Sequence, residues 1–163
     1  MAKRDLPQEI EEFLQVKRIA VAGVSRNGDV AANSVLKKLI KSGYNAIPIN
    51  PNASGELLEG VPSYQSLKTV PDVPEAVVIA THPDRSAEVV KQCAELGIQK
   101  VWFHRSIGQG SVSDEALTEC SRCGIDPIVG GCPLMFCDPV DPIHKLMKYF
   151  LQKNGTVPSC GKH

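Results

Sequence analysis

A loop of glycine, serine and arginine follows the first apolar run of the chain. Gly23, Ser25 and Gly28 occupy the spacing G-x-G-x-x-G, with serine in place of the middle glycine. In dinucleotide-binding loops that glycine lets the backbone approach a pyrophosphate, which the N-terminus of the next helix also attracts. The serine narrows the approach but adds a hydroxyl donor, and Arg26 adds a charge that can pair with phosphate. Asp29 would repel phosphate, so we expect it to cap the helix. The loop predicts phosphate binding, against the alternative of a solvated turn without a ligand.

The second informative loop is Asn50-Pro51-Asn52, which follows another apolar run. NAD-binding domains place an acidic residue near this point to hold the ribose diol, and NADP-binding domains place an arginine there. Neither residue type is present, which argues against a nicotinamide cofactor.

Cysteine and histidine residues offer other chemistry, which we consider weaker. Cys120-x-x-Cys123 falls near the C-terminus of a predicted helix, where the dipole disfavours a thiolate. A four-thiolate zinc site with Cys132 and Cys137 would need an irregular spacing that includes a proline, so we expect no metal. His82 follows a predicted strand, but the spacing yields no Ser/His/Asp or Cys/His signature. We therefore assign no catalytic residue.

Apolar runs alternate with amphipathic segments along the chain. Strands are predicted over 18–24, 44–49, 76–80, 101–103 and 126–129, and helices over 5–16, 32–42, 84–96, 113–123 and 141–151. This alternation predicts an α/β fold: a Rossmann-like open parallel sheet of about five strands with helices on both faces. The long segment 52–74 should hold a short helix or edge element around Ser66–Thr69. Ligands bind such sheets at the carboxyl ends of the strands.

The composition fits one domain over residues 1–163, with a core at 10–151 and a frayed tail at 152–163. Acidic and basic residues balance at 18 each, so we expect neither nucleic acid nor a membrane surface as a partner. No stretch approaches the roughly 20 apolar residues of a membrane span, and the first residues lack a signal-peptide core. We therefore expect a cytoplasmic protein with reduced thiols.

Several stretches resemble the small stand-alone CoA-binding proteins, which are related to the N-terminal domain of the succinyl-CoA synthetase α-subunit. The resemblance runs from about Ile10 to Phe136, and its most specific part is Gly-Tyr-x-x-Ile-Pro-Ile-Asn-Pro, which ends at Pro51. The other matching stretches are 19–25, 60–64 with Leu67, 76–80, 101–102 and 131–133.

The resemblance implies a coenzyme A site formed by several loops. Contacts to the diphosphate are implied for Gly23, Val24, Ser25, Arg26 and Asn27. Asn50 and Pro51 would border the ribose, and Ala80, Thr81, His82 and Pro83 would line the adenine or pantetheine path. Ser106, Ile107 and Gly108 would lie near the pantetheine arm.

Two departures from the family pattern concern the phosphates. Val30-Ala-Ala-Asn33 replaces an Arg-Pro-Ser run, and Asn52 replaces a basic residue. The 3′-phosphate of coenzyme A would therefore depend on Arg26 or Arg85.

The leading hypothesis is a CoA or acyl-CoA binding protein without catalytic machinery of its own, acting as a sensor or carrier. The synthetase also needs a phosphorylated histidine on a further domain, for which this sequence has no match, so we expect no ligase activity. Two alternatives remain: an NAD(P)-binding Rossmann oxidoreductase or redox sensor, and a protein-interaction subunit with a vestigial nucleotide pocket. Association with an identical chain or another protein is also left open.

Overall fold

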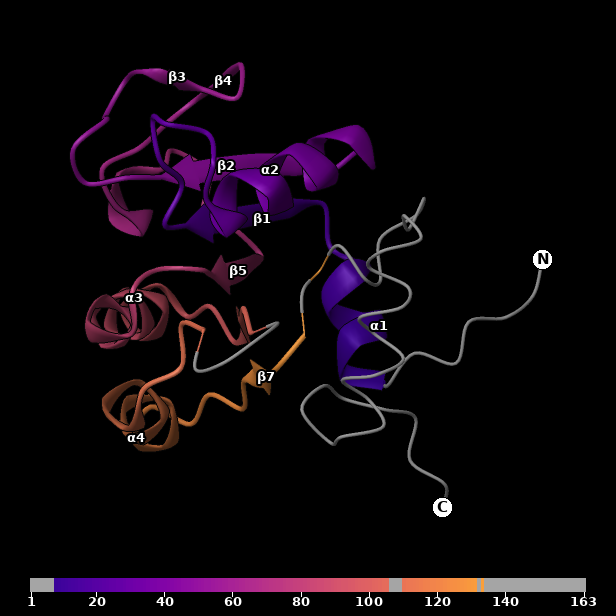
Figure 1. Cartoon of the computed structure of the whole chain (residues 1–163). Coiled ribbons are helices and arrows are strands. Elements are labelled where there is room, and N and C mark those ends of the chain that lie inside the picture. Colours follow the sequence, from indigo (N-terminus) through magenta and orange to yellow (C-terminus); the bar gives the residue numbers. More distant parts are fainter. Residues whose placement is uncertain (1–7, 106–109, 132, 134–163) are drawn as a thin grey trace.

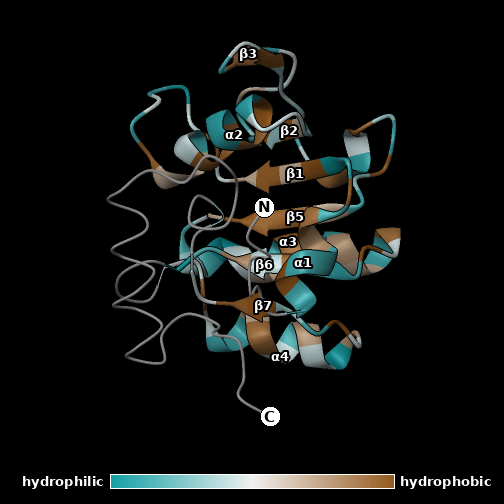
Figure 2. Cartoon of the chain, turned by 90° about the vertical axis from the view of Figure 1, so that its right-hand side faces the viewer, coloured by the Kyte–Doolittle hydropathy of each residue, from teal (hydrophilic) through white to brown (hydrophobic). Residues whose placement is uncertain are grey.

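Five parallel strands form the central sheet of the computed structural model, which describes residues 8–105, 110–131 and 133 (Figure 1). The strands are β1 (Arg18–Ala22), β2 (Asn45–Ile49), β5 (Ala76–Ile79), β6 (Lys100–Phe103) and β7 (Ile128–Val129). Their order in the sheet is β2-β1-β5-β6-β7, so the chain moves outward from β1 to β2 and then crosses to β5 (Figure 2). Ala20 accordingly pairs with Ile47 on one side and with Val77 on the other. The predicted open parallel sheet is confirmed.

Helices cover both faces of this sheet, which explains why its strands are apolar and buried after their first residues. Ile19 and Val21 lie in the core shared with α1 (Gln8–Leu14) and α2 (Ala31–Lys41). Ala20 and Ala22 lie in the core shared with α3 (Pro83–Leu96) and α4 (Asp114–Arg122). Figure 1 shows α3 and α4 on one side of the strands and α1 on the other.

The core beneath α1 is built around Trp102, whose side chain is fully buried. Phe13 packs edge-on against it, with ring centroids 5.3 Å apart. The indole Nε1 donates a hydrogen bond to the Gly130 carbonyl at 3.0 Å, so its polar atom is satisfied. Tyr44 donates to the Leu14 carbonyl at 2.6 Å and attaches the end of α1 to β2.

The long segment between β2 and β5 contains two small elements. A 3₁₀ helix, η1 (Leu67–Thr69), confirms the short helix expected around Ser66–Thr69. An antiparallel hairpin of β3 (Leu57–Leu58) and β4 (Val61–Pro62) was not predicted, because strands of two residues carry no periodic signal. This hairpin stands beyond β2 and α2 at the upper end of the molecule in Figure 1.

Helix boundaries agree with the sequence to within a few residues, with one correction at α2. Val30 occupies the N-cap of α2 and no side chain caps this helix, so the expected cap by Asp29 is wrong. α3 ends as expected at Gly97, which adopts a left-handed conformation with φ of +73°. The predicted helix over 141–151 lies outside the described residues, and none of the helices described could cross a membrane.

Candidate functional site

A cleft of about 520 Å³ opens at the carboxyl ends of β1, β2 and β5. Three other hollows on the described chain are smaller and measure about 300, 300 and 170 Å³. Strand order reverses at this place, and open parallel sheets bind ligands there. The cleft is lined by Ala22–Ser25, Val30, Ile49–Asn52, Gln65, Ala80–His82, Asp84, Arg85, Glu88, Val89 and Gln92.

The cleft brings together most of the site residues expected from the sequence. Those that line it are Gly23, Val24, Ser25, Asn50, Pro51, Ala80, Thr81 and His82. Arg26, Asn27 and Pro83 belong to the same loops but do not line it, and Pro83 instead begins α3. Ser106, Ile107 and Gly108 lie outside the described residues.

Gly23 allows the ends of β1 and β5 to approach each other closely. A Cβ atom at this position would lie 2.4 Å from the carbonyl oxygen of Ala80, a distance that no side chain tolerates. Its φ of +103° is also strained for any other residue. The first glycine of the motif therefore shapes the cleft floor.

Ser25 is held by the buried side chain of Asn33, the last residue of the run that departs from the family pattern. The Ser25 N–H donates to Asn33 Oδ1 at 2.8 Å, and Asn33 Nδ2 donates back to the Ser25 carbonyl at 2.8 Å. The Ser25 Oγ accepts from the backbone N–H of Asn27 at 3.2 Å. The loop is thus closed by internal hydrogen bonds.

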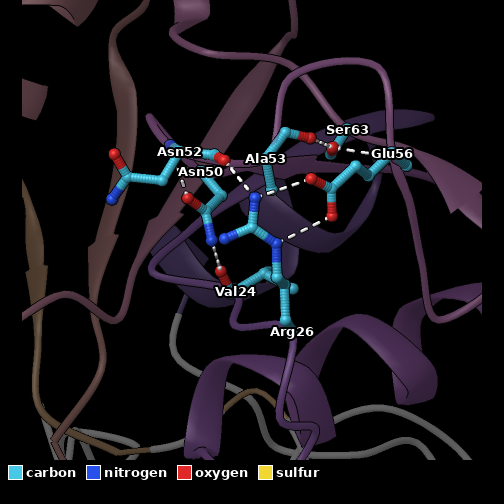
Figure 3. A network of polar contacts seen from close by, with 7 residues as sticks. All are labelled: Val24, Arg26, Asn50, Asn52, Ala53, Glu56 and Ser63. Carbon is cyan, nitrogen blue, oxygen red and sulfur yellow. Dashed lines mark hydrogen bonds and ion pairs between the residues drawn. The ribbon is translucent and has the colours of Figure 1, made fainter.

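Arg26 differs most from its expected role. Its guanidinium donates to both oxygens of Glu56, with Nε–Oε2 at 2.8 Å and Nη2–Oε1 at 2.6 Å, and also to the Asn52 carbonyl (Figure 3). The hydrogen bond raises the pKa of Arg26 and lowers the pKa of Glu56. Glu56 had no local signal in the sequence, since it meets Arg26 only through the fold of segment 52–74.

Asn50 connects the loop after β2 to the loop after β1. Its Nδ2 donates to the Val24 carbonyl at 2.9 Å, and its Oδ1 accepts from the Asn52 N–H at 2.8 Å (Figure 3). Its own N–H donates to the Tyr64 carbonyl at 2.9 Å. The two walls of the cleft are therefore joined by side-chain and backbone bonds.

The third wall of the cleft is formed by α3, from Asp84 to Gln92, and the sequence alone pointed to only part of it. Arg85, Glu88, Val89 and Gln92 line the cleft from this helix. Their spacing of three and four residues places them on one helical face, and this periodicity could have identified them. Among the cleft-lining residues that the structure describes, Arg85 is the only arginine or lysine.

His82 serves as the N-cap of α3. Its Nδ1 accepts from the Asp84 N–H at 3.4 Å and lies 3.2 Å from Asp84 Oδ2. Both side chains are largely exposed to solvent. The imidazole therefore caps the start of α3 at the edge of the cleft.

The three described cysteines lie away from the cleft. Cys93 and Cys120 are buried, and burial raises their pKa values to about 12 and about 11. Among the residues with described positions, no three His, Cys, Asp or Glu side chains gather as metal ligands. Cys132 and Cys137 of the considered zinc site lie outside the described residues.

Comparisons with known proteins point to one family. Residues 17–138 match the model of a family described as CoA binding domain. The chain is 31% identical over 125 residues to the Bacillus subtilis protein named Uncharacterized protein YneT, covering 76% of this chain and 88% of that protein. It is 29% identical over 93 residues to the ADP-forming acetate–CoA ligase II of Archaeoglobus fulgidus, covering 56% of this chain but only 14% of the ligase. A hypothetical protein from Pyrococcus horikoshii OT3 has a similar structure, with a TM-score of 0.67, 28% identity, and coverage of 81% and 93%.

Proposed function

Because the chain belongs to the CoA-binding domain family, we propose that its cleft binds coenzyme A or an acyl-CoA. The observation that carries this proposal is the position of the matching residues: the loops after β1, β2 and β5 converge on one cleft of about 520 Å³. This volume lies within the usual range of small-molecule sites, roughly 300–1,000 Å³.

The N-terminus of α2 supports an anionic ligand at this cleft. Val30 is the N-cap, it lines the cleft, and it makes no side-chain cap hydrogen bond to the first N–H groups of the helix. Such groups, together with the helix dipole, favour phosphate. Gly23, Val24 and Ser25 would accordingly lie against the diphosphate, and coenzyme A would supply the thiol that carries an acyl group.

The remaining cleft residues suit an adenosine group. Asn50 and Pro51 would border the ribose, while Gln65, Val89 and Gln92 offer amide and apolar contacts for a base. Arg85 lies on this wall, whereas Arg26 is paired with Glu56. We therefore assign the 3′-phosphate to Arg85 in preference to Arg26.

A binding role without chemistry, as a sensor or carrier, fits the side chains that face the cleft. His82 uses its side chain to cap a helix at the edge of the cleft. A carrier or sensor needs only saturable binding of its ligand.

The test is calorimetric titration of the full chain with CoA, acetyl-CoA, NAD and NADP. Calorimetry is preferred to tryptophan fluorescence, because Trp102 is buried in the core beneath α1 and does not line the cleft. We expect saturable binding of CoA and weaker binding of both nicotinamide cofactors. Tighter binding of NAD or NADP would replace the proposal with an oxidoreductase or redox sensor. No binding of any ligand would favour a protein-interaction subunit.

A further inference from the structure

We propose that Asn33 and Glu59 are positioning residues that hold the loop after β1 in the conformation that receives the diphosphate. The inference rests on the proposed CoA binding. It concerns two residues that do not line the cleft and would act through Ser25, which does.

Asn33 is a polar side chain enclosed in the core. Only 1% of its surface is exposed, and it lies in the first turn of α2. Its amide bonds both the N–H and the carbonyl of Ser25, eight residues earlier in the chain. A buried side-chain amide that forms hydrogen bonds through both its oxygen and its nitrogen holds its partners rigidly. Removing such an amide leaves buried polar groups without hydrogen bonds, which costs free energy. The bonded pair therefore sets the backbone of Ser25 relative to the helix.

Glu59 completes this arrangement from the turn of the β3–β4 hairpin. Asn33 Nδ2 donates to Glu59 Oε1 at 2.8 Å, and Lys37 Nζ lies 3.6 Å from Glu59 Oε2. A Cβ atom on Gly28 would lie 3.5 Å from the same Oε1 atom, so the carboxylate sits directly beside the loop. The hairpin thus supplies the acceptor for the second amide hydrogen of Asn33.

Glu59 and Gly60 form the two-residue turn of the hairpin, and both have positive φ. Glu59 has φ of +50° and is the only non-glycine residue with positive φ within the described chain. Such conformations are unfavourable for residues other than glycine and persist where surrounding contacts compensate. The bonds to Asn33 and Lys37 are contacts of this kind.

The experiment compares Asn33→Ala, Glu59→Ala and Glu59→Gln with the matched control Asn45→Ala, which removes an exposed asparagine at the start of β2. Each full-length variant is titrated with CoA and with adenosine 3′-phosphate, which lacks the diphosphate. We expect Asn33→Ala to weaken CoA binding about tenfold, because an unheld loop must be ordered on binding. Adenosine 3′-phosphate should bind within about twofold of the wild type.

Glu59→Gln separates hydrogen bonding from charge. The glutamine still offers an oxygen to Asn33, so this variant should bind CoA at least as tightly as the wild type, whereas Glu59→Ala should resemble Asn33→Ala. The two alanine substitutions should also be less than additive, because they break one connected network. If Asn33→Ala does not fold, the difference in CoA affinity between Glu59→Gln and Glu59→Ala still tests whether the network positions the loop.

Equal CoA affinity in the alanine variants and the wild type would overturn the inference, as would equal weakening of both ligands. Hydrogen exchange of the Ser25 N–H provides a readout that needs no ligand. The Ser25 N–H should exchange slowly in the wild type and rapidly in Asn33→Ala. If the wild type binds no CoA, the proposed function fails, while the exchange result still decides whether Asn33 holds the loop.

Discussion

Arg26 and Glu56 form an ion pair held by two hydrogen bonds, although they lie 30 residues apart in the chain. The pair connects the loop after β1 to the segment that precedes β3. The arginine is one of two cations that the sequence assigned to coenzyme A phosphates, yet its guanidinium is bonded to a carboxylate. Both side chains are about half exposed, at 52% and 47%. The negative charge of Glu56 therefore offsets the positive charge of Arg26 near the cleft, and both side chains remain accessible to solvent.

The first prediction concerns Glu56→Gln. Loss of the carboxylate removes a negative charge near the ligand and releases the guanidinium, so CoA affinity should rise about two- to fivefold at low salt. Calorimetry at two salt concentrations measures the effect, which should shrink as salt rises. The control is Glu95→Gln, which removes the carboxylate from an exposed ion pair with Lys68, and neither residue lines the cleft. Equal affinities in the two variants would contradict the prediction.

The second prediction concerns Arg85→Ala. If Arg85 contacts the 3′-phosphate, the variant should lose about tenfold in affinity for CoA and almost nothing for dephospho-CoA. The control is Lys91→Ala, which removes an exposed cation from the same helix without changing the cleft. A parallel loss for both ligands would show that Arg85 does not recognise that phosphate.

The third prediction compares Gly23→Ala with Gly43→Ala. Both glycines have positive φ, +103° at Gly23 and +91° at Gly43. A Cβ atom added at Gly23 would clash with the Ala80 carbonyl, whereas one added at Gly43 would meet no atom within 4 Å. Gly43→Ala should cost about 1 kcal/mol in the free energy of unfolding, from backbone strain alone. Gly23→Ala should cost about 3 kcal/mol or more and abolish CoA binding. Urea unfolding measures the difference, and similar costs for the two would argue against the clash.

The fourth prediction is a dependence of stability on pH at Glu75. Its Oε2 accepts the backbone N–H groups of Arg18 at 2.9 Å and Lys17 at 3.0 Å, and the Arg18 bond is the main reason that its pKa is lowered from 4.5. A lowered folded-state pKa stabilises the protein above the unfolded value, and this stabilisation is lost as pH falls through the folded value.

Glu75→Gln removes that ionisable group. The variant should be less stable than the wild type at neutral pH, and the difference should narrow below about pH 4.5. Urea midpoints measured from neutral to acidic pH test this. A difference that stays constant with pH would exclude the carboxylate as its source.

The fifth prediction concerns thiol reactivity. Cys93 and Cys120 are buried, and their raised pKa values of about 12 and about 11 leave almost no thiolate near pH 8. Neither should be alkylated by iodoacetamide until the protein unfolds, whereas Cys123 is partly exposed and should react first of the three. Peptide mass spectrometry after brief labelling measures the order. Rapid labelling of Cys93 in the folded protein would contradict it.

The sequence by itself determined the class of the fold and the edge of the sheet where a ligand would bind. Continuous apolar runs such as 76–79 indicate strands covered on both faces, and the spacing of Gly23, Ser25 and Gly28 indicates a phosphate-binding turn. These signals are local, because each depends on neighbouring residues or on one backbone conformation. The positions of Ser25 and Asn50 in the cleft follow directly from them.

Only the tertiary structure decided which side chains face the cleft and which are used to build it. Arg26 could pair with a phosphate or with a carboxylate, and the segment that carries Glu56 places an acceptor within reach of it. Asn33 reads as a departure from the family pattern, yet the fold makes it the connection between Ser25 and Glu59. Such choices depend on hydrogen-bond geometry between residues far apart in the chain, which no local pattern of residue types records.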